Sequence, residues 1–194
     1  LIGTQVLAKG HHFPLLTLVG ILDADLGLNG GDLRASERTY QLLHQVSGRA
    51  GREQKPGKVV LQTYHPDHPL FNAVRNHKRD EFYTCELQQR QMQEFPPYGY
   101  LAAVIISGFD EATVERYAKM LGKTLPETNT VTVLGPVSAP ISRLKNRYRW
   151  RFLIKSSQPM VIQSFLKNWL QNSTLKKPTG SIRVNIDIDP YSFI

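Results

Sequence analysis

Apolar positions in the first part of the chain occur in short unbroken runs separated by a helical pattern. Residues 16–22 read Leu-Thr-Leu-Val-Gly-Ile-Leu, and residues 58–63, Lys-Val-Val-Leu-Gln-Thr, predict a second short strand after the turn at Pro56-Gly57. Unbroken apolar runs of this length are typical of strands covered on both faces of a parallel sheet. Between the runs, up to about Ala50, apolar residues recur at three-residue steps and predict a helix. Strand, helix and strand predict part of a nucleotide-binding α/β sheet.

The rest of the chain combines a polar helix with a strand-rich region. Residues 70–94 are rich in Arg, Gln and Glu and predict one long helix that ends before Pro96-Pro97. Beyond it the patterns predict, in order, a strand at 100–108, a helix at 111–125, strands at 131–137 and 148–154, a helix at 159–170 and a strand at 181–189. This βαββαβ order predicts a ferredoxin-like domain.

We therefore expect an α/β part followed by an α+β part. The expected boundaries are an α/β segment at 1–69, a linker helix at 70–97 and a ferredoxin-like domain at 98–194. Residues 1–7 predict a buried strand that starts at the first residue, whereas natural chains rarely begin inside a core strand. The sequence is therefore expected to be a fragment of a longer protein.

Composition excludes several classes of protein. The 194 residues are 41% hydrophobic and 21% charged, which is too apolar for a disordered chain. No apolar run approaches the roughly 18–20 residues of a membrane span, and the first residues lack the features of a signal peptide. Cys85 is the only cysteine, which excludes an internal disulfide and a cysteine-based zinc site. A reducing, cytoplasmic setting without a membrane partner is expected.

Positive charge is concentrated in the C-terminal half. The net charge is +8, and residues 98–194, with 13 basic and 6 acidic side chains, carry +7 of it. In the segment 143–151 every basic residue is odd-numbered, so an extended backbone puts them all on one face. We expect this face, joined by Arg183 if the last strand is near, to contact phosphates; a charged surface without a ligand is the alternative. The basic residues in question are Arg143, Lys145, Arg147, Arg149, Arg151 and Arg183.

Aromatic residues occupy the even-numbered positions of the same segment. They are Tyr148, Trp150 and Phe152, and Ile154 continues the series. Aromatic side chains on a sheet either stack on bases, as in RNA-recognition sheets, or pack into a core beneath helices. Because the series continues into Ile154, we favour the core for this face.

The strongest chemical signal is the segment Gln45-Val-Ser-Gly-Arg-Ala-Gly-Arg52. On a helix, Gln45, Arg49 and Arg52 are spaced by four and three residues and share a face. Two guanidinium groups one turn apart match the charge that develops on a γ-phosphate during transfer. Gly48 and Gly51 each cost about 1 kcal/mol relative to alanine in a helix, and they let the helix end approach a partner. We predict that Gln45, Gly48, Arg49 and Arg52 bind nucleotide; the alternative is a surface helix with solvated arginines.

This segment is similar to motif VI of superfamily 2 helicases, which supplies the arginine finger. Residues 3–14 (Gly-Thr-Gln-Val-Leu-Ala-Lys-Gly-His-His-Phe-Pro), followed by Thr-Leu-Val, resemble motif V. The particular form of both motifs resembles the PriA family of bacterial replication restart helicases, also called primosomal protein N′. Further agreement comes from Asp32-Leu-Arg-Ala-Ser-Glu-Arg38, Val60-Leu-Gln-Thr63 with His65-Pro66, Phe95-Pro-Pro97, Leu134-Gly-Pro136 and Asp187-Ile-Asp-Pro190.

The resemblance implies a fold, an activity and partners. It implies that residues 1–69 are the end of the second RecA-like helicase lobe, and that the whole protein is an ATP-dependent 3′-to-5′ DNA helicase that needs Mg. Such a protein recognises stalled forks and restarts replication through primosome assembly. The implied partners are forked and single-stranded DNA, the acidic tail of single-stranded DNA-binding protein and other primosome proteins. Thr4 and Lys9 would lie near the DNA backbone, and the odd-numbered basic residues would contact fork DNA or the acidic tail of single-stranded DNA-binding protein.

The cofactor sites of the family are expected to be incomplete in this chain. The family's phosphate-binding loop, its Asp-Glu pair and its zinc-binding cysteines lie upstream of motif V, and this sequence contains no Gly-x-x-x-x-Gly-Lys-[Ser/Thr] and no cysteine cluster. Histidine pairs without a third ligand do not predict a metal site either. We expect the chain alone not to hydrolyse ATP. Two other interpretations are a different superfamily 2 DNA translocase and a non-enzymatic nucleic-acid-binding module.

Overall fold

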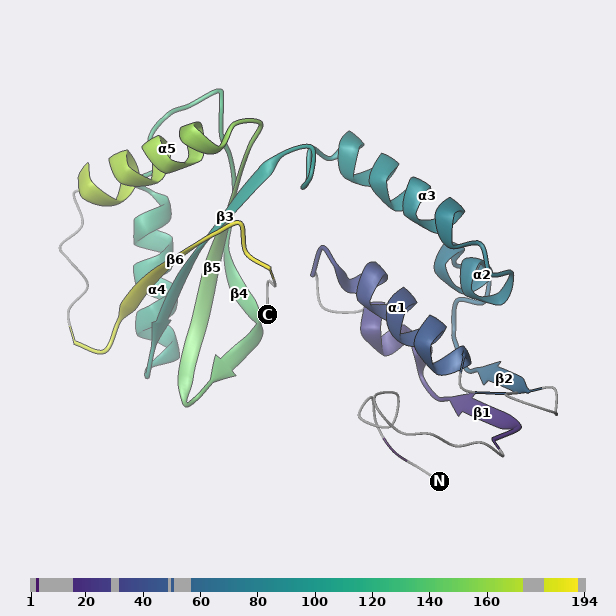
Figure 1. Ribbon diagram of the computed structural model, residues 1–194. Coiled ribbons are helices and arrows are strands. Elements are labelled where there is room, and N and C mark those ends of the chain that lie inside the picture. Colours follow the sequence, from purple (N-terminus) through teal and green to yellow (C-terminus); the bar gives the residue numbers. More distant parts are fainter. Residues whose placement is uncertain are drawn as a thin grey trace. The chain divides into compact units, whose positions relative to one another are not determined.

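The computed structural model of the chain describes residues 3, 16–28, 32–48, 50, 57–172 and 180–191. The chain divides into two compact units, Leu1–Cys85 (unit 1) and Glu86–Ile194 (unit 2), and each is described by itself (Figure 1). The strand predicted at 1–7 lies outside the described residues. Within the described ranges, no helix is both long and apolar enough to cross a membrane.

Unit 1 contains a parallel pair of strands. The strands β1 (Leu18–Ile21) and β2 (Lys58–Leu61) pair in register from Leu18↔Lys58 to Ile21↔Leu61. They confirm the strands predicted within 16–22 and 58–63. Two helical elements, η2 (Ala24–Leu28) and α1 (Ala35–Ser47), follow β1. In α1, Tyr40 and Leu43 are buried and start the core of the unit.

The single polar helix predicted over 70–94 is wrong, because the segment forms two helices. α2 (Pro69–Arg75) ends before α3 (Arg79–Met92) begins. His77 takes a left-handed backbone with φ 56°, and the N–H of Lys78 donates to the carbonyl of Ala73 at 2.9 Å. These are the features of a Schellman C-cap, here without the glycine that usually marks it in a sequence.

The two helices also differ in what they bury. The buried residues of α2 are Leu70, Phe71, Ala73 and Val74. In α3 only Phe82 is buried, and its ring stacks on that of Tyr40 with centroids 4.5 Å apart. α2 is therefore an apolar part of the unit 1 core, and the polar composition of the segment comes mainly from α3.

Unit 2 follows the predicted order of elements, βαββαβ. They are β3 (Tyr100–Gly108), α4 (Glu111–Gly122), β4 (Thr132–Leu144), β5 (Arg147–Ser156), α5 (Pro159–Asn172) and β6 (Arg183–Ile188). The strands form one sheet in the order β4-β5-β3-β6, with every neighbouring pair antiparallel. β3 and β5 are therefore central, and β4 and β6 are at the edges.

β4 is longer than predicted. It continues beyond the expected end at Val137 to Leu144, and it passes through Pro136 and Pro140. Its pairing with β5 shifts register twice, between Leu134 and Val137 and again between Ser138 and Arg143. Proline is tolerated in an edge strand and at irregular pairing because no ladder hydrogen bond from its nitrogen is required there. The prolines therefore mark an edge position and do not end the strand.

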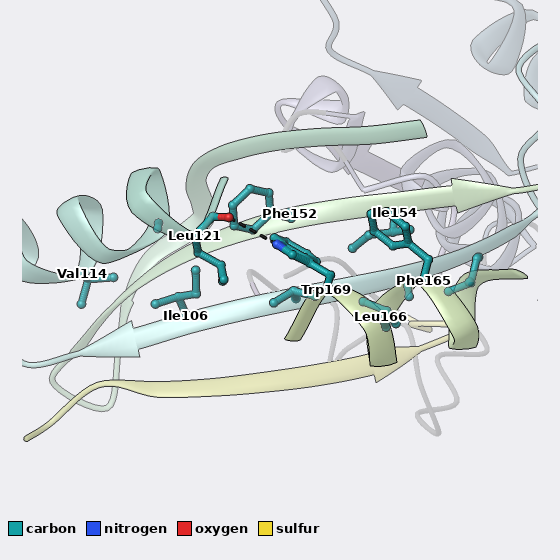
Figure 2. Packing of buried hydrophobic residues seen from close by; sticks show 12 residues of the cluster. Ile106, Val114, Leu121, Phe152, Ile154, Phe165, Leu166 and Trp169 are labelled. Carbon is teal, nitrogen blue, oxygen red and sulfur yellow. Dashed lines mark hydrogen bonds between the residues drawn. The ribbon is translucent and has the colours of Figure 1, made fainter. Parts of the chain in front are cut away.

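The core of unit 2 lies between the sheet and the helices α4 and α5 (Figures 1 and 2). Phe152 and Ile154 of β5 are fully buried there, which confirms the core prediction for the even-numbered face, and Trp150 packs against the same cluster. Trp169 of α5 meets Phe152 edge-on with ring centroids 5.1 Å apart, and its indole N–H donates to the carbonyl of Leu121 at 3.3 Å. Trp169, the largest side chain of the core, is therefore held by its ring packing and by a hydrogen bond from its one polar atom.

Candidate nucleic-acid interface and nucleotide motif

The predicted nucleotide motif begins in the last turn of α1. Gln45 is exposed there, and the helix ends at Ser47, before the predicted limit. Gly48 follows, and its N–H donates to the carbonyl of His44 at 3.1 Å. A Cβ added at Gly48 would lie 3.5 Å from that carbonyl oxygen, an ordinary contact. The described residues leave room for alanine here, so the close approach predicted from Gly48 stays a prediction.

Four predicted site residues lie outside the described part of the chain: Thr4, Lys9, Arg49 and Arg52. The common face predicted for Gln45 and the two arginines therefore stays a prediction. The DNA contacts predicted for Thr4 and Lys9 have the same standing.

A carboxylate fixes the start of α1. Asp32, whose side chain is only 6% exposed, pairs with the guanidinium of Arg38 at 2.6 Å and accepts a hydrogen bond from the N–H of Arg34 at 3.0 Å. Arg34 is the N-cap residue and Arg38 lies in the first turn, so one carboxylate holds the backbone before the helix and one side chain within it. The ion pair between Asp32 and Arg38 therefore gives both ends of the Asp32-to-Arg38 segment a structural role. It also helps to orient the helix that carries Gln45.

A polar cluster that the sequence pattern did not reveal lies where β1 and β2 end. Asp25 is buried and accepts hydrogen bonds from the Thr63 hydroxyl at 2.7 Å and from the Tyr64 N–H at 2.8 Å. The Tyr64 bond lowers the pKa of Asp25, burial opposes this shift, and the Thr63 bond adds to the lowering. The carboxylate ties the segment after β1 to the segment after β2. An Asp within four residues of the end of one strand and a Thr two residues after the end of the next were the available signal.

Unit 2 presents one sheet face that α4 and α5 do not cover (Figure 1). The even-numbered positions of β3 and β5 pack against the helices, so the odd-numbered positions lie on this second face. On it, Arg149 of β5 and Arg183 of β6 flank Ser107 of β3 in one cross-strand row. The next row begins with Arg151. Only β3 therefore lies between Arg183 and the basic residues of β5. The odd-numbered side of this sheet is called the arginine face below.

Arg147 lies at the end of the arginine face and is held within the protein. Its guanidinium donates to the Ser107 hydroxyl at 3.3 Å, to the Ser107 carbonyl at 3.0 Å and to the carbonyl of Ser181. It also lies over the ring of Phe109, with 4.7 Å between Cζ and the ring centroid. Arg147 therefore joins the end of β3 to the segment that enters β6. A DNA phosphate would have to compete with these acceptors for the Arg147 guanidinium.

Two of the predicted basic residues do not lie on the arginine face. β4 and β5 form a hairpin whose turn is Lys145-Asn146, with φ values of 48° and 62°. Arg143 stands opposite Tyr148 in β4, so it lies on the even-numbered face, with its guanidinium 5.1 Å from the Tyr148 ring centroid. The expectation that all five basic residues share one face is wrong, because the chain reverses inside the segment.

A further lysine on the odd-numbered series escaped the sequence reasoning. Lys155 of β5 donates to the carbonyl of Gln93 at 2.9 Å, pairs with Glu94 at 3.4 Å and lies 5.8 Å from the ring centroid of Phe95. Its ammonium group therefore anchors the segment after α3 to the sheet. No group of three or more potential metal-ligating side chains occurs among the residues that the structure describes.

Comparison with known proteins finds relatives along the whole sequence. The family described as Primosomal protein N C-terminal domain matches residues 91–191 of the chain. The replication restart protein PriA of Rickettsia conorii is 48% identical over 193 residues, which cover 100% of this chain and 29% of that protein. PriA of Bacillus subtilis is 41% identical over 195 residues (98% of this chain, 24% of that protein), and PriA of Haemophilus influenzae is 38% identical over 192 residues (98% and 26%).

These matches define a class: proteins that carry the C-terminal domain of primosomal protein N. The chain belongs to the PriA family of replication restart proteins. It spans less than a third of the length of these curated relatives, 29% of the Rickettsia conorii protein.

Proposed function

We propose that the chain is part of an ATP-dependent 3′-to-5′ DNA helicase that recognises stalled or branched replication forks and restarts replication through primosome assembly. The observation that carries this proposal is the similarity along the whole chain, 48% over 193 residues, to a protein named for replication restart. The two segments that resemble helicase motifs, residues 3–14 and Gln45–Arg52, are both present in the sequence and support the proposal.

The proposed architecture has two parts. The parallel pair of β1 and β2 supports a RecA-like lobe for unit 1, because parallel strands with crossover helices are the framework of that fold. For unit 2, the βαββαβ order and the antiparallel strand order β4-β5-β3-β6 support a ferredoxin-like domain.

The proposed nucleotide contacts come from the end of α1 and the residues after it. Gln45, exposed on the last turn, can donate an amide hydrogen bond to nucleotide, and Gly48 leaves the helix end free of a side chain. Arg49 and Arg52 would neutralise γ-phosphate charge, as guanidinium groups do in phosphoryl transfer. ATP with Mg would supply the free energy of unwinding, and zinc would belong to the upstream part of the protein.

The proposed partners follow from the arginine face and from the family. Forked and single-stranded DNA would meet the basic side chains of β5 and β6, since phosphate contacts dominate nucleic-acid affinity. We further propose the acidic tail of single-stranded DNA-binding protein and other primosome proteins as partners of the whole protein. Thr4 and Lys9 would contact the DNA backbone from the helicase lobe.

The test uses the 194-residue chain and two measurements. Fluorescence-anisotropy titration with labelled forked and single-stranded DNA, at several salt concentrations, is expected to show binding that weakens steeply with salt and that prefers forks. ATP turnover by the chain alone is expected to be absent, because the phosphate-binding loop is not in the sequence. Absence of DNA binding at low salt would refute DNA contact by this chain, and sustained ATP turnover would refute the division of the catalytic site.

A further inference from the structure

The arginine face carries a local imbalance of charge. In the cross-strand row formed by Arg149, Ser107 and Arg183, the two arginines stand on either side of β3 and the row holds no carboxylate. Their Cα atoms are about 10 Å apart, twice the spacing of neighbouring strands. Asp187 is the acidic residue of β6 on this face, and it lies about 13 Å along the strand from Arg183. The row itself therefore holds positive charge without compensation.

One guanidinium nitrogen in this row lacks an acceptor. The Nη1 atom of Arg149 is buried, and it has no hydrogen-bond partner among the described residues. A buried N–H of a charged group without an acceptor is costly, and the nearby Arg183 adds like-charge repulsion. The Arg149 side chain as a whole is half-buried, so its guanidinium would have to turn outward to meet an anion, and an anion held between the two arginines would then remove both costs.

The hydroxyl between the arginines is oriented to donate. Ser107 is only 7% exposed, and its Oγ accepts a hydrogen bond from Nε of Arg147 at 3.3 Å. Because a serine hydroxyl has one hydrogen and that bond uses an oxygen lone pair, the hydrogen is left to donate to a third group. Arg147, which is fixed by its own bonds to two carbonyls, is therefore a positioning residue for Ser107.

The geometry points to a binding site for a single backbone phosphate of DNA, formed by Arg149, Arg183 and the Ser107 hydroxyl. The site rests on the proposed DNA contact of unit 2 and gives it a defined centre. Two forked cations and one neutral donor suit the singly charged, oxygen-rich phosphodiester group.

The same face explains why the contact would not read sequence. The strand positions on it carry no aromatic side chain: they are Leu101, Ala103, Ile105 and Ser107 of β3, Arg147, Arg149, Arg151, Leu153 and Lys155 of β5, and Arg183, Asn185 and Asp187 of β6. Sheets that read single-stranded bases stack them on aromatic residues. The aromatic residues of β5 are on the helix-covered face instead, so this site would bind the backbone of any sequence.

The test is a double-variant cycle on the 194-residue chain, read by the salt dependence of its binding to labelled oligothymidylate. Arg149→Gln and Arg183→Gln are each expected to weaken binding about tenfold and to reduce the salt slope by about 0.7, the value for one phosphate of a single strand. Because the two arginines share that phosphate, the double variant should also lose only about 0.7. Ser107→Ala should weaken binding about threefold with an unchanged slope, because the hydroxyl is neutral.

Arg116→Gln is the matched control. Arg116 is exposed on α4, which packs on the opposite face of the sheet, and the substitution removes the same charge from the same unit. Both tryptophans, Trp150 and Trp169, are in unit 2, so a fluorescence melt of each variant shows that this unit is folded. Variants at Arg149 and Arg183 that bind like the control, or whose slope losses add, would overturn the shared site while leaving DNA binding intact. A wild-type chain that binds no DNA would overturn the proposed DNA contact itself.

Discussion

Replacing Arg147 with alanine tests whether this arginine stabilises unit 2 or contacts DNA. The side chain makes three donor contacts, to the hydroxyl and carbonyl of Ser107 and to the carbonyl of Ser181, and it lies over Phe109. A hydrogen bond from a charged group contributes about 1.5–3 kcal/mol, but bonds made by one half-buried side chain do not add. We expect Arg147→Ala to lower the free energy of unfolding of unit 2 by about 2–4 kcal/mol.

The assay is thermal unfolding followed by tryptophan fluorescence, which reports on unit 2 alone because both tryptophans lie there. For a domain of about 100 residues, 1 kcal/mol corresponds to roughly 4 °C, so Tm should fall by about 8–16 °C. Arg147→Lys should recover only part of this loss, because an ammonium group cannot reproduce the fork of a guanidinium. The salt slope of DNA binding, measured below the transition, should change by less than half of the change caused by Arg149→Gln.

The opposite pattern would refute this reasoning. If Arg147→Ala melts within about 1 °C of the wild type, below the shift expected from a loss of 0.5 kcal/mol, the three contacts do not stabilise the unit. If the same variant loses a full phosphate from the salt slope, Arg147 is a DNA contact and not the positioning residue inferred here. Arg116→Ala, which removes an exposed arginine of α4, is the control for charge.

Three further results are expected. Trp169→Phe should cost unit 2 about 2 kcal/mol in chemical denaturation, because the Leu121 carbonyl and the Thr124 hydroxyl lose the indole N–H donor and a gap opens in the core. Gly99→Ala should prevent normal packing of the segment before β3, seen as a lower Tm, since the added Cβ would lie 2.1 Å from the carbonyl oxygen of Glu94. Hydrogen bonds from Thr113 lower the pKa of Asp110 at the start of α4. The contribution of this carboxylate to the stability of unit 2 is therefore present above the unfolded pKa and is lost as the pH falls through the folded pKa. Asp110→Asn should flatten the dependence of unfolding on acid below about pH 4.

Local patterns predicted the interior of unit 2 well. The bounds of β3 and the order of all six elements followed from apolar strand runs and helical spacing, because β3, β5 and both helices bury a face in a common core. The burial of Phe152 and Ile154 followed for the same reason.

The failures arose where the backbone departs from regular geometry. The hairpin turn at Lys145-Asn146 requires two residues with positive φ, and a pattern of odd-numbered charges does not show such a reversal. The break between α2 and α3 is a C-cap made without glycine, so its usual signal is missing. An arginine is available to a ligand only if acceptors of the protein itself do not hold it. For Arg147 one such acceptor is the carbonyl of Ser181, which is distant in the sequence, so local patterns could not show it.

The prolines of β4 bear on how this protein behaves at high concentration. An edge strand of this length offers a row of backbone groups to the strands of other molecules, and several of its apolar side chains, Leu134, Val137 and Ile141, are exposed. Pro136 and Pro140 each remove one N–H from that row, and the two register shifts bend it out of a regular ladder. Pro140→Thr should therefore leave the fold of a single molecule intact but promote self-association, visible as light scattering that rises with protein concentration.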